Sequence, residues 1–139
     1  IHFEAVTPAE ERRMGALTCR FFWTQHYIPC LAVRIEDPEG RVLVYGADGG
    51  PQAGLAQFAA GASLLVLEAT LLEAETRFET EHRGHLSGAE AARVAQVAGA
   101  ERLLLTHYFT ETADQVLAEA QASGGVAVAL AQEGIEYVC

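Results

Sequence analysis

The stretch Val42-Leu43-Val44-Tyr45-Gly46-Ala47-Asp48-Gly49-Gly50-Pro51 decides how this chain can fold. A run of apolar β-forming residues ends at one carboxylate, and the glycines and proline that follow would end the strand. Because the run has no polar alternation, it predicts a strand that is buried on both faces. Two later segments share this plan: residues 64–67 lead into Glu68, and residues 103–106 lead into His107. Open α/β sheets bind ligands at the carboxyl ends of their strands, so these three polar endings predict one shared site.

Length and composition favour one globular domain, residues 1–139, with a buried core. The formal net charge is −10, and all nine basic residues are arginine. A chain without lysine can form neither a lysine Schiff base nor a Walker-type phosphate site. The acidic balance and the lack of a basic run also disfavour a free-standing nucleic-acid binder.

Cysteine usage and hydropathy point to a reducing, aqueous compartment. The three cysteines (Cys19, Cys30 and Cys139) form no C-x-x-C pair, and no apolar run approaches the roughly 20 residues of a membrane helix. The first residues do not resemble a signal peptide. We therefore expect a cytoplasmic protein that does not enter membranes. Because the chain begins with Ile1, we also expect further protein sequence upstream.

The first third of the chain predicts antiparallel β structure. A polar cluster around Gly15 and a Pro-Gly segment are typical of turns. We expect strands at residues 1–6, 17–23, 30–35 and 41–47, with turns at 10–15 and 37–40.

The remainder alternates between helix and strand. The capping box Ser87–Glu90 begins one helix, and Gly99 ends it. We expect the other helices at 52–60 and 113–122, strands at 63–67, 102–106, 126–130 and 135–138, and a short helix or loop at 70–80. A mixed sheet follows, with right-handed crossovers and helices on one face. Since a buried sheet needs cover on both faces, the chain looks like one half of a four-layer sandwich.

Asp48 and His107 are the strongest candidate metal ligands. Each alone has an ordinary explanation, because Asp before Gly-Gly is a common turn residue and a histidine at a strand end is often a hydrogen-bonded surface side chain. Together, at equivalent ends of two buried strands, a carboxylate and an imidazole suit zinc or a similar ion. Two ligands do not complete a tetrahedral site.

Several motifs occur in the order that is typical of one family. They are Thr24-Gln25-His26-Tyr27-Ile28-Pro29-Cys30, the Tyr45 to Pro51 segment, Leu65-Val66-Leu67-Glu68-Ala69-Thr70, Gly84-His85-Leu86-Ser87 with Ala91-Ala92, and Leu104-Leu105-Thr106-His107-Tyr108. This order resembles the C-terminal half of the metallo-β-lactamase superfamily, and its ribonuclease Z-like branch in particular. The resemblance covers nearly the whole chain. It implies an α/β fold, namely the C-terminal half of a four-layer αββα sandwich.

The resemblance also implies roles for individual residues. Asp48 would bridge two metal ions, and His107 would bind one of them. His85 would lie near the scissile group and assist catalysis; otherwise it is a hinge histidine packed on the sheet. Glu68 would orient its neighbours at the floor of the site, or is simply a carboxylate at a buried edge. The remaining histidines His26 and His82 would lie at the pocket rim or in solvent.

Two departures from the family pattern limit these roles. The family's H-x-H-x-D-H motif and its next histidine ligand belong to an N-terminal half that this chain does not contain. Gly49 stands where the family usually has threonine after the metal-binding aspartate, so a hydroxyl is missing there.

The leading hypothesis is a metal-dependent hydrolase of phosphodiester, ester or related bonds, acting through a metal-bridging hydroxide. Its cofactor would be a divalent metal, two zinc ions or else manganese or iron, and the chain alone would be inactive. The substrate would be a small molecule or a phosphodiester, with nucleic acid left open. The uncovered sheet face predicts a homo-oligomer or the missing N-terminal half as partner. The alternative is a metal-free, non-catalytic α/β module that acts by protein association.

Overall fold

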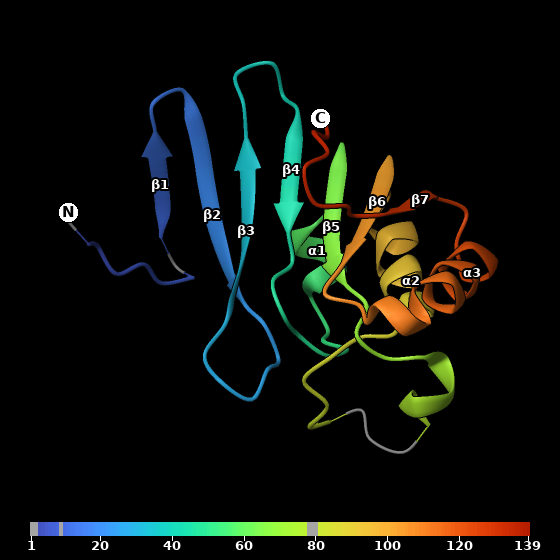
Figure 1. The fold of residues 1–139 in the computed structure, drawn as a ribbon. Coiled ribbons are helices and arrows are strands. Elements are labelled where there is room, and N and C mark those ends of the chain that lie inside the picture. The colour runs from blue at the N-terminus through green and yellow to red at the C-terminus, as the bar shows by residue number, and fades with distance from the viewer. Residues whose placement is uncertain (1–2, 9, 78–80) are drawn as a thin grey trace.

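One sheet of seven strands organises the described part of the chain, and its strands lie side by side in sequence order (Figure 1). The computed structural model describes residues 3–8, 10–77 and 81–139. Strands β1 to β4 pair antiparallel, and β4 to β7 pair parallel. The strands are β1 (Glu11–Met14), β2 (Leu17–Trp23), β3 (Leu31–Glu36), β4 (Val42–Tyr45), β5 (Leu64–Glu68), β6 (Arg102–Thr106) and β7 (Ala127–Leu130). The predicted α/β fold with a mixed sheet is confirmed.

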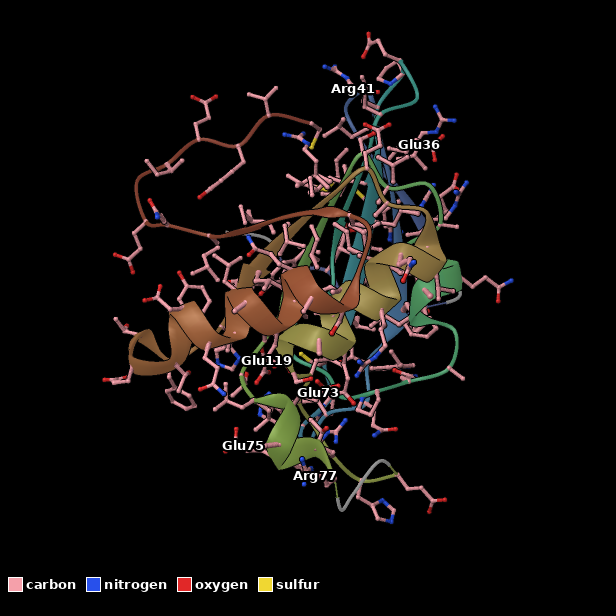
Figure 2. The ribbon with its side chains drawn as sticks, turned by 90° about the vertical axis from the view of Figure 1, so that its right-hand side faces the viewer. Glu36, Arg41, Glu73, Glu75, Arg77 and Glu119 are labelled. Carbon is pink, nitrogen blue, oxygen red and sulfur yellow. The ribbon has the colours of Figure 1, made fainter. Side chains whose placement is uncertain are left out.

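Helices connect the parallel strands and build the core on one face of the sheet. They are α1 (Leu55–Phe58), α2 (Gly88–Ala98) and α3 (Ala113–Ser123), with 3-10 turns η1 (Glu73–Thr76) and η2 (Thr110–Thr112). Helices α2 and α3 pack against each other (Figures 1 and 2). Leucines of β5 and β6 and alanines of α2 share the core with them, and all of these are almost fully buried. No helix in the described ranges is long and apolar enough to cross a membrane.

The opposite face of the sheet is apolar but remains accessible. Leu17, Trp23 and Tyr45 share this face, because strand side chains alternate, and they are 38%, 47% and 45% exposed. The C-terminal segment crosses part of the same face, where Tyr137 lies near Leu43. This arrangement is the one expected for half of a sandwich.

The local signals in the second half of the chain correspond closely to the structure. Ser87 Oγ accepts a hydrogen bond from the Glu90 amide at 3.2 Å, and Glu90 Oε2 accepts one from the Ser87 amide at 3.0 Å. Gly99 ends α2 with φ 63°, a value that glycine adopts without steric cost. The predicted capping box and helix end are therefore confirmed.

The N-terminal prediction was wrong in its pairing. Residues 10–15 do not form only a turn, since Glu11–Met14 is the edge strand β1. Arg20 Nε donates to Glu11 Oε2 at 2.9 Å across the pair, so charged side chains suit this edge. Residues 3–6 lie outside any strand, and the rest of the strand predicted at 1–6 lies outside the described residues.

Two further elements differ from their predictions. The helix predicted at 52–60 is confined to Leu55–Phe58, because Gly54 precedes it with φ 99° and Ala59 ends it, two residues before Gly61. The strand predicted at 135–138 has no ladder; Arg102 Nη2 donates instead to the Val138 carbonyl. Of residues 70–80, only Glu73–Thr76 is a helical turn, and 78–80 lie outside the described residues.

Substituting alanine for Gly50 tests the close packing of the loop after β4. A Cβ atom at Gly50 would lie 1.7 Å from the Arg83 carbonyl oxygen, so the backbone would have to move. We expect Gly50→Ala to lower the free energy of unfolding by about 2–3 kcal/mol in urea denaturation. The control is Gly125→Ala, since a Cβ there meets nothing within 4 Å. Equal free energies of unfolding for Gly50→Ala and Gly125→Ala would contradict the close contact between Gly50 and the Arg83 carbonyl.

Candidate active site

Two carboxylate–imidazole pairs meet at the carboxyl ends of the parallel strands. Asp48 follows β4, Glu68 ends β5, His107 follows β6, and His85 precedes α2. His107 Nδ1 lies 3.2 Å from Asp48 Oδ1, and His85 Nδ1 lies 2.8 Å from Glu68 Oε1. The ring centroids of the two histidines are 5.6 Å apart. Residues that the sequence separates widely thus form one cluster.

The Glu68 carboxylate is closed to solvent, whereas its partner His85 is 20% exposed. The Glu68 side chain is 1% exposed. Its Oε1 accepts from the Gly49 amide at 2.9 Å and is bonded to His85 Nδ1, while its Oε2 accepts from the Thr70 amide at 3.2 Å and the Thr70 hydroxyl at 2.6 Å. A carboxylate offers about four acceptor positions, and all four are used. Glu68 therefore holds its neighbours and has no lone pair left for a ligand.

The Asp48 pair is open. The Asp48 side chain is 35% exposed and that of His107 is 50% exposed. His107 Nδ1 also lies 3.2 Å from the Thr70 hydroxyl, whose oxygen is 2.9 Å from the His107 carbonyl. A proton on Nδ1 is therefore held by Asp48 or Thr70, which leaves Nε2 as the nitrogen available to a ligand.

The backbone is strained at the two strand ends that carry Asp48 and His107. Ala47 has φ 53° and His107 has φ 50°, a region that non-glycine residues rarely adopt. Among the described residues these are the two non-glycine residues with positive φ. Such strain persists where the surroundings impose it and is common at functional sites.

Thr24 packs against Gly49, the position at which the chain departs from the family pattern. A Cβ at Gly49 would lie 2.8 Å from Thr24 Cβ, so Thr24 fills the space that a side chain at position 49 would need. The Thr24 hydroxyl donates to the Asp48 carbonyl at 2.7 Å. A hydroxyl from Thr24, the residue after β2, therefore lies beside Gly49.

Tyr45 lies on the open sheet face close to this cluster. Burial raises the pKa of the Tyr45 phenol, and the negative charges of Asp48 and Cys30 raise it further. The Tyr45 phenol therefore stays neutral to a higher pH than an ordinary tyrosine.

Of the two remaining histidines singled out in the sequence, His26 lies beside the cluster and His82 does not. The His26 ring centroid lies 5.0 Å from that of His85 in an edge-on arrangement. His82 is exposed, and within the described ranges no hydrogen bond, ion pair or ring contact links it to the cluster.

Arg83 supports the cluster and had no signal in the sequence. It is only 6% exposed and forms an ion pair with Glu90 of the capping box. Its Nε donates to the His85 carbonyl at 3.1 Å, and its Nη1 donates to the Thr76 carbonyl at 2.9 Å. The segment that carries His85 is therefore anchored to the start of α2.

Arg83→Met tests this anchor. Removing one partner leaves the Glu90 carboxylate poorly solvated, so we expect a loss of about 3 kcal/mol in the free energy of unfolding, measured with urea. Arg93→Met is the matched control, because the Arg93–Glu73 pair is about half exposed on both sides and such pairs contribute about 0–1 kcal/mol. A similar small loss in both variants would refute the anchoring role.

The donor chemistry of the cluster fits a divalent metal in part. Ligand atoms of Glu68, His85 and His107 lie within 4.8 Å of one another. Saturation of Glu68 argues against that trio and favours the open Asp48 and His107 as the metal-facing pair. A zinc site usually takes three protein ligands or more, so Asp48 and His107 by themselves would not complete one.

Comparisons with known proteins agree with this architecture. The family model of the beta-lactamase superfamily domain matches residues 3–108, and the chain belongs to this superfamily. Ribonuclease BN of Erwinia tasmaniensis is 40% identical over 88 residues, which is 60% of this chain and 29% of that protein. The probable metallo-hydrolase YhfI of Bacillus subtilis is 36% identical over 103 residues, 74% of this chain and 41% of that protein.

Solved structures give the same result. The crystal structure of YhfI superposes with a TM-score of 0.84 at 32% identity, covering 95% of this chain and 54% of that one. The short form of human tRNase Z superposes with a TM-score of 0.68 at 27% identity, covering 89% of this chain and 44% of that one. The chain spans about half or less of the length of these proteins.

Proposed function

We propose that this chain supplies one side of the active site of a metal-dependent hydrolase. The observation that carries the proposal is the contrast between its two carboxylates: Glu68 is buried and has all its acceptor positions filled, whereas Asp48 is partly exposed beside the exposed His107. A carboxylate whose acceptor positions are all filled orients its histidine partner, here His85. A partly exposed carboxylate and an exposed imidazole, here Asp48 and His107, have atoms free to bind a ligand. Asp48 and His107 would be the metal ligands, and His85 would act on the substrate.

Zinc, manganese and iron all accept carboxylate and imidazole ligands. We expect the complete site to bind two such ions. A divalent ion bound there supplies Lewis-acid activation of water and of the attacked bond. The protein's own contribution is geometry: the strained backbone at Ala47 and His107 and the Thr24 hydroxyl on the Asp48 carbonyl fix the two ligands in advance.

His85 is suited to proton transfer. The bond between its Nδ1 and Glu68 fixes the tautomer and the ring orientation, so Nε2 is the nitrogen that faces substrate. In the neutral ring Nε2 is an acceptor, so it would first hydrogen-bond a proton donor of the attacked group or of the attacking water and take up that proton. The imidazolium so formed would then protonate the leaving group.

The charge distribution favours a small ester or phosphodiester as substrate. Two arginines on the helical side of the cluster, Arg83 and Arg93, are paired with Glu90 and Glu73. Figure 2 shows Glu73, Glu75 and Glu119 near η1, with Arg77 on the same side of the molecule. Some relatives are named ribonucleases. A polynucleotide, however, rewards clustered free cations, and this side of the chain is mainly acidic.

The open face of the sheet implies a partner layer. Leu17, Trp23 and Tyr45 would be covered by a second α/β half of the same protein or by another copy of the chain. In our proposal residues 1–139 form the C-terminal half of the domain, and that layer brings the remaining metal ligands. The three free cysteines agree with a cytoplasmic location.

Asp48→Asn in the natural gene product that contains residues 1–139 tests the proposal. We expect the variant to lose bound metal and to hydrolyse bis(p-nitrophenyl) phosphate at least about a hundredfold more slowly, because an amide is a poorer ligand than a carboxylate. Elemental analysis and turnover are measured together. The control is Asp114→Asn, at an exposed position in the first turn of α3. Full metal content and turnover in Asp48→Asn would refute the role of Asp48.

The exposed apolar face also suits the second candidate function, a metal-free module that acts by association. It predicts less than one metal equivalent in the purified gene product and a stable complex that buries Trp23. Metal analysis of the purified gene product separates the two functions, because one metal equivalent or more contradicts the metal-free module. Sedimentation of a Trp23→Ser variant then tests the association that the module requires: an unchanged complex would contradict it.

A further inference from the structure

The Thr70 hydroxyl lies between the two carboxylate–imidazole pairs and contacts both. Its oxygen is 2.6 Å from Glu68 Oε2 and 3.2 Å from His107 Nδ1. It is also 2.9 Å from the His107 carbonyl oxygen and 3.4 Å from His85 Nδ1. One hydroxyl therefore joins the buried carboxylate of one pair to the exposed imidazole of the other.

The number of protons decides the direction of these contacts. A hydroxyl has one proton to donate and two lone pairs that accept. The 2.6 Å distance to Glu68 is that of a charge-assisted O–H···O⁻ bond, so the Thr70 proton belongs there, and the His107 carbonyl is its second, longer partner. Toward the two imidazoles the Thr70 oxygen can then only accept. The Nδ1 proton of His85 goes to Glu68 Oε1, which at 2.8 Å is nearer than Thr70, so Thr70 is left to accept from His107.

His107 Nδ1 thus has two acceptors at the same distance. Asp48 Oδ1 and Thr70 Oγ1 each lie 3.2 Å from it. In the proposed site Asp48 would also bind a metal ion, and an N–H that lost its acceptor to that ion would be left without a partner, at a cost in free energy. Thr70 removes this conflict, because it accepts the Nδ1 proton and leaves the Asp48 carboxylate to the ion.

Backbone bonds on both sides hold Thr70 in this position. The Ala69 amide donates to the Thr106 carbonyl at 2.9 Å, and the Leu71 amide donates to the Leu86 carbonyl at 3.0 Å. Thr106 and Leu86 are each next to one of the two cluster histidines in the sequence. The hydroxyl is therefore fixed relative to both imidazoles before any ligand binds.

We propose that Thr70 is a positioning residue that orients His107 on behalf of Glu68 and so leaves Asp48 free to bind a metal ion. The buried charge of Glu68 polarises the hydroxyl that donates to it, which makes the Thr70 oxygen a better acceptor. One carboxylate then keeps the proton on Nδ1 of both imidazoles, of His85 directly and of His107 through Thr70. Metal-binding histidines usually donate their second N–H to such a partner. The consequence for the metal rests on the proposed function, whereas the hydrogen-bond chain from Glu68 through Thr70 to His107 does not.

The tautomer of His107 in metal-free protein tests the hydrogen-bond chain. The natural gene product is labelled with ¹⁵N-histidine and dialysed against EDTA, and ring ¹⁵N spectra then distinguish Nδ1–H from Nε2–H. We expect Asp48→Ala to keep the Nδ1–H form of His107, because Thr70 still accepts the proton. The double variant Asp48→Ala/Thr70→Val should lose that preference, and Asp48→Ala/Thr70→Ser should retain it, since serine keeps the hydroxyl.

His85 is the internal reference in these spectra. Its Nδ1 proton is accepted directly by Glu68, so it should remain in the Nδ1–H form in every variant. Loss of the Nδ1–H form of His107 in Asp48→Ala alone, or its persistence in Asp48→Ala/Thr70→Val, overturns the hydrogen-bond chain.

Zinc affinity tests the consequence for the metal, with Asp48 intact. Thr70→Val should weaken zinc binding about tenfold or more in competition with a chelating dye, the loss that is typical when the outer partner of a ligating histidine is removed. Thr70→Ser should bind zinc nearly as well as wild type. The matched control is Thr7→Val, because the Thr7 hydroxyl also donates to a glutamate, Glu10, but at an exposed position. Wild-type zinc affinity in Thr70→Val overturns the role of Thr70 toward the metal. No zinc binding by wild type, with the tautomers as expected, rejects the proposed function while the hydrogen-bond chain stands.

Discussion

The Glu68 carboxylate is the group on which the geometry of the site depends. Burying an ionised carboxylate costs several kcal/mol unless its acceptor positions are filled. Here donors fill them from the loop after β4, from the residues that follow β5 and from the segment before α2. If one of these segments moved, a buried charge would lose a partner. The three segments are therefore locked together, and His85 and the peptide after Asp48 are positioned before any ligand arrives.

The strand ends beside Glu68 have a strained backbone, which also depends on its surroundings to persist. Ala47 and His107 occupy left-handed conformations that cost roughly 1–3 kcal/mol each. The well-packed layer of leucines and alanines between the sheet and α2 stabilises the fold enough to keep them there. The core thus holds Asp48 and His107 at an angle that a relaxed strand end would not adopt.

The two faces of the sheet and its carboxyl edge have different roles. One face binds the helices and provides stability, the carboxyl edge carries the polar cluster, and the second face is apolar and accessible. All three surfaces belong to one sheet of seven strands. A partner layer on the open face would therefore also border the cluster edge, beside Tyr45. In our proposal the same contact would cover the apolar face and complete the site.

The sequence by itself determined the buried strands β4 to β6, their polar ends and the capped helix α2, because these features follow from local periodicity and capping chemistry. It did not determine the edge strand Glu11–Met14 or the unpaired 135–138 segment, since pairing at an edge depends on the neighbour that is available. Only the tertiary structure decided which carboxylate pairs with which imidazole, that Arg83 is buried beneath His85, and that Thr24 fills the space beside Gly49. These contacts depend on the register of three parallel strands and on loops far apart in the chain, and no local pattern encodes them.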